Sequence, residues 1–263
     1  QQEQPQLFSG AGLNNFFTPR IWFSYLLLWP LCLPMFPQML MRFFAAEDDR
    51  SLKQSMVLYP IVAGVLFVCP VLIGVWGHVA FPDLIGRAAD QIMPLMLGRF
   101  APAWLTGLVM VGALAAFMST LDSQLLALSS MFTRDVYRRY LRPEASLGEQ
   151  VRVGQMAVVA LAVAGLCIAL RPPDAILTLA THAFSGLAIL FPVMVGAVYG
   201  LRCSALAAVL SVLCGELVLL GFALQWLPEQ FAAGFLPLVP ALTVSLMILG
   251  LDSALLALRR TAH

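Results

Sequence analysis

The densest cluster of polar side chains in otherwise apolar sequence lies between residues 115 and 130, in the stretch AAFMSTLDSQLLALSS. On an α-helix, which advances about 100° per residue, Ser119, Thr120 and Ser123 fall within about 100° of one another. Hydroxyl and carbonyl oxygens are the ligands that hard cations prefer. A local distortion that freed the carbonyl of Ala116 would add a third oxygen to the hydroxyls of Ser119 and Thr120, within reach of one sodium ion.

The same hydroxyls have an alternative role, because serine and threonine in membrane helices often donate a hydrogen bond to the carbonyl four residues earlier. Their spacing leaves both roles open. Asp122 shares this face, and Asp122 and Glu216 are the two charged residues that lie deep in apolar sequence. Such a group is costly in a membrane unless it has a partner. Asp122 is therefore a candidate functional residue that could also accept a proton, and the alternative is a carboxyl that pins its helix to a neighbour. Glu216 is expected only to pair with a polar group on an adjacent helix.

Composition indicates that the solvent of this chain is lipid. Of its 263 residues, 60% are hydrophobic and 11% are charged, and the mean hydropathy is +0.88, whereas soluble domains have about 25% charged residues. The five cysteines lack metal-type spacing and are interpreted as packing residues. The net charge of +1 argues against a nucleic-acid surface. No metal cluster, phosphate loop or Ser/His/Asp arrangement is visible in the sequence, so we do not expect an enzyme.

Apolar runs of about 20 residues, the length that crosses a bilayer, recur along the sequence. They predict an all-α membrane protein, a single bundle over residues 1–263. Residues 90–100 are too short to cross and predict a helical turn at the interface. Pro30, Pro34 and Pro37 each remove a backbone hydrogen bond, so the first span is expected to be bent or locally unwound. Seven spans are predicted, at about residues 18–42, 55–80, 104–133, 151–170, 174–199, 203–225 and 235–257.

Arginine and lysine gather on one side of the predicted spans, eleven against four. Because positively charged loops stay in the cytoplasm, the first span is expected to run inward from outside. Residue 1 is glutamine, and no signal peptide precedes that span. We therefore expect the carboxyl-terminal half of a longer protein, with the missing amino-terminal helices as its partner. The cytoplasmic set is Arg42, Arg50, Lys53, Arg134, Arg138, Arg139, Arg142, Arg152, Arg202, Arg259 and Arg260, and the outer set is Arg20, Arg87, Arg99 and Arg171.

Residues 107–140, GLVMVGALAAFMSTLDSQLLALSSMFTRDVYRRY, closely resemble the signature helix of the solute:sodium symporter family, which includes sodium/proline, sodium/pantothenate, monocarboxylate and sodium/glucose transporters. The pattern is a small-residue helix, then Ala-x-x-Ser-Thr/Ser, then a serine-rich turn that ends in Asp-x-Tyr. Residues 37–55, 90–97 and 184–200 resemble the family's inside loop, outer segment and next conserved helix. One departure is Tyr-Gly-Leu-Arg at 199–202, where the family has Trp-Lys/Arg-Arg. The resemblance implies the LeuT-type fold of two inverted five-helix repeats, with ion and substrate sites near the midplane.

The resemblance also implies roles for individual residues. The family's sodium site falls on the Ala116 carbonyl and the Ser119 and Thr120 hydroxyls, with the remaining ligands expected on a first core helix outside this chain. Asp122 and Ser123 match positions where some members bind a second sodium ion.

Two further groups follow from the same resemblance. Tyr25, Trp29 and Gln38 lie on the broken first span, which family members use to contact substrate, and packing is the alternative role. His182 and Ser185 lie on a span that resembles a gate element, and a structural hydrogen bond is the alternative for the histidine.

Together these features predict sodium-coupled symport of a small organic solute, such as an organic acid or amino acid, across the inner (cytoplasmic) membrane. The expected partners are Na⁺, the solute and the lipid bilayer, with no nucleic acid. Two alternatives stay open: the membrane sensor of a histidine-kinase-type signalling protein, and a non-transporting membrane subunit. The sequence does not identify the solute.

Overall fold

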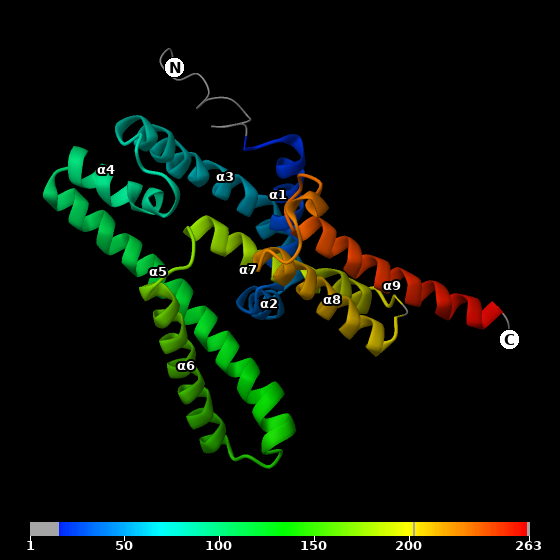
Figure 1. The fold of residues 1–263 in the computed structure, drawn as a ribbon. Coiled ribbons are helices and arrows are strands. Elements are labelled where there is room, and N and C mark those ends of the chain that lie inside the picture. Colours follow the sequence, from blue (N-terminus) through cyan, green and yellow to red (C-terminus); the bar gives the residue numbers. More distant parts are fainter. Residues whose placement is uncertain (1–15, 202, 262–263) are drawn as a thin grey trace. The chain divides into compact units, whose positions relative to one another are not determined.

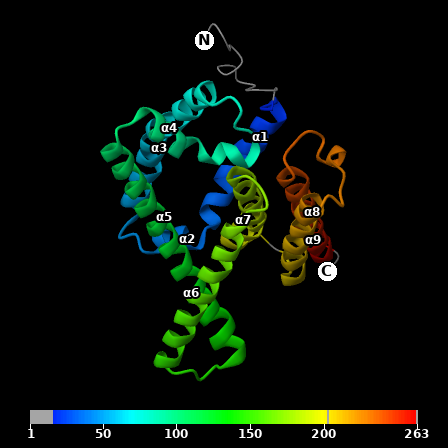
Figure 2. The ribbon, with the colours of Figure 1, turned by 60° about the vertical axis from the view of Figure 1, so that its left-hand side comes forward.

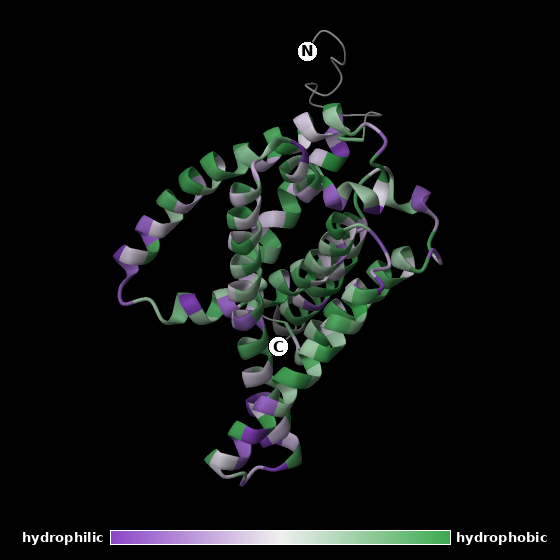
Figure 3. Cartoon of the chain, turned by 90° about the vertical axis from the view of Figure 1, so that its left-hand side faces the viewer, coloured by the Kyte–Doolittle hydropathy of each residue, from purple (hydrophilic) through white to green (hydrophobic). Residues whose placement is uncertain are grey.

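The computed structural model describes residues 16–201 and 203–261, and every regular element in them is a helix. Six helices are long and apolar enough to cross a membrane, and a broken pair, Pro19–Met35 with Pro37–Phe44, makes a seventh when counted as one span. Hydrophobic residues run along these helices, and hydrophilic residues gather in the connecting loops (Figure 3). The prediction of an all-α membrane protein with about seven spans is confirmed.

The chain divides into two compact units. The terminal unit comprises Gln1–Phe36 with Leu177–His263, and the middle unit comprises Pro37–Ile176. The expected single bundle stays a prediction. Helices of the terminal unit are α1 Pro19–Cys32, η3 Leu33–Met35, α7 Ile176–Val198, α8 Ala205–Ala223, η6 Glu229–Ala232 and α9 Leu238–Thr261. Those of the middle unit are α2 Pro37–Phe44, α3 Asp49–Ala80, η4 Gly86–Gln91, α4 Ile92–Phe100, α5 Ala103–Met131, η5 Phe132–Leu141 and α6 Leu147–Leu170.

The break between η3 and α2 lies at Phe36, whose backbone is extended at φ −64° and ψ 124°. Pro37 follows it and disfavours helical geometry at the residue before it. Pro34 lies at the start of η3, whereas Pro30 is accommodated inside α1. The expected interruption of the first span is therefore confirmed, and it lies at the last of its three prolines.

In the middle unit, α5 and α6 run side by side and are joined by a short loop (Figure 1). The expected span ends near residue 133, but the helix continues beyond it: η5 extends α5 to Leu141 as a π-helix. Ser146 then caps α6 by accepting a hydrogen bond from the backbone N–H of Glu149 at 3.3 Å. Asp48 caps α3 in the same way through Ser51, and these hydrogen bonds hold the pKa of its carboxyl below the usual value.

Residues 86–100 form η4 and α4, as the expected helical turn before α5. Gly77 of α3 lies directly against the side chain of Ile92, where a Cβ would overlap it. Asp90 accepts a hydrogen bond from the backbone N–H of Ile176 at 3.0 Å. These contacts join α3 to α4, and η4 to Ile176, the last residue of the middle unit. Their position at a membrane interface stays a prediction.

The terminal unit has a core to which α1, α7, α8 and α9 all contribute, around the fully buried Leu28, Ile189 and Leu238. Figure 2 shows α8 and α9 side by side. Two buried serines join them: the Ser211 and Ser245 hydroxyls lie 2.6 Å apart, and Ser211 also donates to the Ser245 carbonyl at 3.1 Å. Interhelical hydrogen bonds of this kind stabilise helix pairs where apolar burial cannot.

Asp252 of α9 holds the start of α8. Its carboxylate accepts the backbone N–H of Ser204 at 2.6 Å and the Ser204 hydroxyl at 3.0 Å, and that hydroxyl accepts the N–H of Ala207. Charge-assisted hydrogen bonds contribute about 1.5–3 kcal/mol each. We therefore expect Asp252→Ala to lower the free energy of unfolding by about 3 kcal/mol or more, measured by titration with SDS. The exposed Asp83→Ala is the control, and equal stability of the two variants would contradict this role.

Candidate functional site

Helix α5 carries the polar cluster predicted from the sequence as an unbroken α-helix. Thr120 donates its hydroxyl to the Ala116 carbonyl, with Oγ1 and O 3.2 Å apart. Ser123 donates to the Thr120 carbonyl at 2.9 Å, and its hydroxyl also lies 3.2 Å from the Ser119 carbonyl. The local distortion expected at Ala116 is absent. The regular helix already brings the Ala116 carbonyl and the Thr120 hydroxyl together. The hydrogen bonds present are those of the alternative role, donation to the preceding turn.

Between Ala116 and Ser123, two polar groups on this face have no hydrogen-bond partner in the part of the chain that the structure describes: the Ser119 hydroxyl and the Asp122 carboxylate. Ala116, Ser119, Thr120 and Asp122 are exposed, and Ser123 is half-buried. The helix around them is apolar enough to span a bilayer. Unpartnered polar groups are costly against lipid, so membrane proteins turn them towards protein or a water-filled cavity. This face of α5 thus needs a polar neighbour.

The distance between the Thr120 hydroxyl and the Ala116 carbonyl also suits a cation. At a metal–oxygen distance of about 2.4 Å, within the range for hard cations, two oxygens 3.2 Å apart subtend about 84° at the metal. Adjacent ligands in octahedral shells subtend about 90°. A rotation of the Thr120 hydroxyl proton would turn the hydrogen-bonded pair into two ligands without moving the helix. Hydrogen bonding within the helix and cation binding are thus compatible roles for the Thr120 and Ala116 oxygens.

The residues predicted to contact substrate lie on either side of the break in the first span. Trp29 of α1 packs against Phe184 of α7, with ring centroids 5.5 Å apart, and Tyr25 packs against the core of the terminal unit. Both contacts fit the packing alternative. Gln38 is half-buried on α2, in the middle unit with α5. A substrate role for these three residues stays a prediction.

The residues predicted to act as a gate differ from each other in environment. Ser185 of α7 is buried and donates its hydroxyl to the Thr181 carbonyl at 2.7 Å. His182, one turn earlier, is exposed and has no hydrogen-bond partner among residues 16–201 and 203–261. The structural hydrogen bond proposed as the alternative role is thus absent for the histidine and present for the serine.

Glu216 of α8 has a position that sequence reasoning missed. Both carboxylate oxygens lie against Gly186 of α7, where an added Cβ would come within 3.3 Å of each. The adjacent Gly215 lies against Ile189, one turn further along α7. The only signal in the sequence is a charged residue inside an apolar run, beside a glycine, and it does not identify the partner helix. The expected pairing of Glu216 with a polar group is not seen in the described residues.

The Asp-x-Tyr end of the polar segment lies on η5. Tyr137 donates its hydroxyl to the Glu149 carboxylate of α6 at 2.6 Å, and Glu149 is also the third residue of the Ser146 cap. Nearby, the Thr133 hydroxyl is buried without a partner, 3.4 Å from where a Cβ on Gly154 would lie. This end of the segment therefore packs η5 against α6, and it lies well along the helix from Ser119.

The fold and the polar face of α5 define a multi-pass helical membrane protein with a candidate cation site inside one of its spans. The model of the sodium:solute symporter family matches residues 2–215, and the chain belongs to this family. The resemblance found in residues 107–140 is thereby confirmed. The family consists of secondary transporters rather than enzymes, as predicted.

Several curated relatives are similar over most of this chain. The sodium/pantothenate symporter of Haemophilus influenzae is 29% identical over 215 residues, which cover 80% of this chain and 44% of the relative. The sodium/proline symporter of Escherichia coli is 28% identical over 191 residues, 70% of this chain and 38% of the relative. The Escherichia coli sodium/pantothenate symporter is 28% identical over 255 residues, 94% and 50% of the two chains. The chain thus spans half or less of the length of these relatives, and no solved structure matches it.

Proposed function

We propose that this chain forms part of a sodium-coupled symporter that carries a small organic solute across the inner (cytoplasmic) membrane. Membership of the sodium:solute symporter family and the membrane-spanning helices support transport. The observation that carries the sodium assignment is the group of oxygens on one turn of α5: the Ala116 carbonyl and Thr120 hydroxyl 3.2 Å apart, beside a Ser119 hydroxyl that has no hydrogen-bond partner among the described residues.

Three oxygens from one helical turn occupy only one side of a cation. We therefore propose that the other ligands come from a first core helix of the full-length transporter. Sodium would then join α5 to that helix. Because sodium would bind the substrate-binding conformation more tightly than the other conformations, it would favour that conformation. By linkage, bound solute would raise the affinity for sodium by the same factor. This reciprocity couples the downhill movement of sodium to the uptake of solute.

The other predicted residues take part in the same proposal. Asp122 and Ser123 are one helical turn from Ser119, where a carboxylate could bind a second ion or a proton. Tyr25, Trp29 and Gln38 would contact the solute, and His182 and Ser185 would belong to a gate.

Two relatives suggest the class of solute. They are named sodium/pantothenate and sodium/proline symporters, and both of these solutes carry a carboxylate. We propose a small carboxylate-bearing solute for this protein too, with proline and pantothenate as the first compounds to test.

The test is uptake by the full-length protein in proteoliposomes. An inward sodium gradient is expected to drive accumulation of one of these solutes, and potassium or choline in place of sodium should abolish it. Equal uptake in choline would rule out sodium coupling. Absence of uptake for a broad set of amino and organic acids would favour the sensor or the non-transporting subunit.

A further inference from the structure

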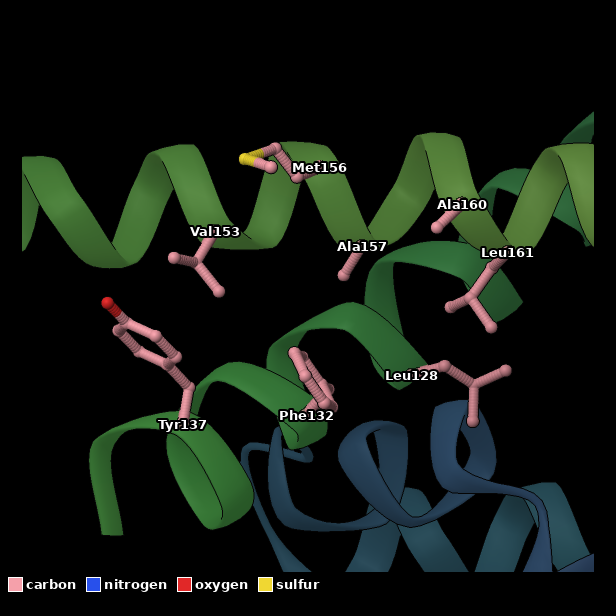
Figure 4. A pocket seen from close by; sticks show the side chains of 8 residues that line it. All are labelled: Leu128, Phe132, Tyr137, Val153, Met156, Ala157, Ala160 and Leu161. Atoms are coloured by element: carbon pink, nitrogen blue, oxygen red, sulfur yellow. The ribbon is translucent and has the colours of Figure 1, made fainter. Parts of the chain in front are cut away.

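An open groove runs between α5–η5 and α6 in the middle unit, with a volume of about 660 Å³ (Figure 4). Side chains from the two helices line it in pairs at three levels. Tyr137 and Val153 lie nearest the connecting loop, Phe132 and Ala157 come next, and Leu128 and Leu161 lie deepest in the spans. The two helices run antiparallel, so the groove follows them for about 12 Å, the length of eight helical residues. We call this the α5–α6 groove.

The groove is apolar and accessible. Among the eight described residues that line it, Tyr137 carries the only polar side-chain group, a hydroxyl that is already bonded to Glu149 at 2.6 Å. The side chains of Phe132 and Leu128 remain 42% and 43% exposed. The volume lies within the about 300–1,000 Å³ typical of small-molecule sites. A flexible hydrocarbon chain meets these requirements, because it needs apolar walls and no hydrogen bonds.

A second recess lies beside the groove, on a neighbouring face of α6, with a volume of about 580 Å³. Met156 and Ala160 line both recesses and form the ridge between them. Arg152, Gln155 and Val159 line only the second one, so it begins at a cation and continues along an apolar face of α6. Two apolar recesses that flank one ridge, with a guanidinium at one end, match the two acyl chains and the headgroup of a phospholipid.

The charged residues around the end of the groove nearest the loop between η5 and α6 have a net positive charge. Between residues 132 and 152 there are five arginines and three acidic residues, five minus three giving +2. One of the acids, Glu149, accepts the Tyr137 hydrogen bond. Within the described residues, none of the five arginines forms an ion pair. The arginines are Arg134, Arg138, Arg139, Arg142 and Arg152, and the acids are Asp135, Glu144 and Glu149.

We propose that the α5–α6 groove and the adjacent recess bind an anionic phospholipid of the cytoplasmic leaflet. One acyl chain lies in the groove, the other lies along Gln155 and Val159, and the phosphate contacts Arg152 and the arginines of η5. Basic sites at the cytoplasmic end of membrane helices attract anionic headgroups. A packed apolar helix would fill the groove only, whereas an anionic phospholipid also supplies a counter-charge for these arginines. The site is independent of sodium and solute, so this inference goes beyond the proposed function.

The test is native mass spectrometry of the full-length protein, titrated with phosphatidylglycerol or phosphatidylcholine of identical acyl chains. We expect at least about fivefold tighter binding of phosphatidylglycerol, since each arginine near a headgroup contributes about that factor. Arg152→Gln should weaken phosphatidylglycerol binding about fivefold and leave phosphatidylcholine unchanged. Ala157→Phe should weaken both lipids, because the ring fills the groove.

Two matched controls separate the site from general effects. Arg50→Gln removes an exposed arginine from the start of α3, and Ala164→Phe adds the same ring to an exposed position of α6 outside both recesses. Both should bind lipid like the unmodified protein. The proposal is overturned if phosphatidylglycerol binds no tighter than phosphatidylcholine, or if Arg152→Gln and Ala157→Phe bind like their controls. The second result is also what a groove covered by other helices of the full-length protein would give.

Discussion

Replacing Thr120 by alanine is expected to raise the sodium concentration for half-maximal uptake by about tenfold or more. The hydroxyl is one of the proposed ligands, and a polar contact to a charged group contributes about 1.5–3 kcal/mol. Ser119→Ala should have an effect of similar size, because the Ser119 hydroxyl makes no competing hydrogen bond within residues 16–201 and 203–261. The measurement is initial uptake by the full-length protein as a function of sodium concentration.

Two variants control this prediction. Thr120→Ser keeps the hydroxyl and should retain nearly unchanged sodium dependence. Ser130→Ala removes a hydroxyl from the same face of α5 about 16 Å along the helix axis, too far to contact the same ion. Unchanged sodium dependence in both Ser119→Ala and Thr120→Ala would remove the site from α5. The hydroxyls would then have only the structural role that their hydrogen bonds already show.

The second large effect is expected at Gly215, where α8 meets α7. A Cβ there would lie 2.7 Å from Cγ2 of Ile189, which is itself fully buried. Overpacking of a well-packed core costs about 1–3 kcal/mol and occasionally more. We expect Gly215→Val to lower the free energy of unfolding by about 3 kcal/mol, at the upper end of that range, because both side chains are branched at Cβ. SDS titration followed by circular dichroism measures this loss.

Gly165→Val is the matched control, because no atom outside the adjacent turns of α6 lies within 4 Å of a Cβ at that position. It makes the same change in helix propensity without the overlap. Adding Ile189→Ala to Gly215→Val should recover part of the lost stability, since the double variant relieves the contact. If Gly215→Val is no less stable than Gly165→Val, the close packing of α7 on α8 is contradicted.

Most of the fold could be predicted from hydropathy and proline. Long apolar runs identify helices that must satisfy their own backbone in lipid, and the three prolines of the first span predict that it is interrupted, although not at which proline. The end of α5 could not be predicted. Residues 132–141, FTRDVYRRYL, are too polar to extend an apolar run, and they resemble a cytoplasmic loop in composition. The π-helical hydrogen bonds that continue the helix there have no hydropathy signal.

The candidate site could be predicted in part. The spacing of Ser119 and Thr120 gave their shared face and both possible roles, and the structure adds that the hydroxyl of Thr120 and the Ala116 carbonyl are adjacent without distortion. Spacing within one helix says nothing about contacts between helices. The position of Glu216 against Gly186, thirty residues earlier, therefore had no signal in the sequence.

Equilibrium binding of ²²Na⁺ to the purified full-length protein tests the central claim most directly, since it needs no knowledge of the solute. Saturable binding is predicted for the unmodified protein and for Ser130→Ala. The Ser119→Ala/Thr120→Ala double variant should lose it, while keeping the same circular dichroism spectrum. Saturable binding of equal affinity in the double variant would contradict the assignment of sodium to this turn of α5.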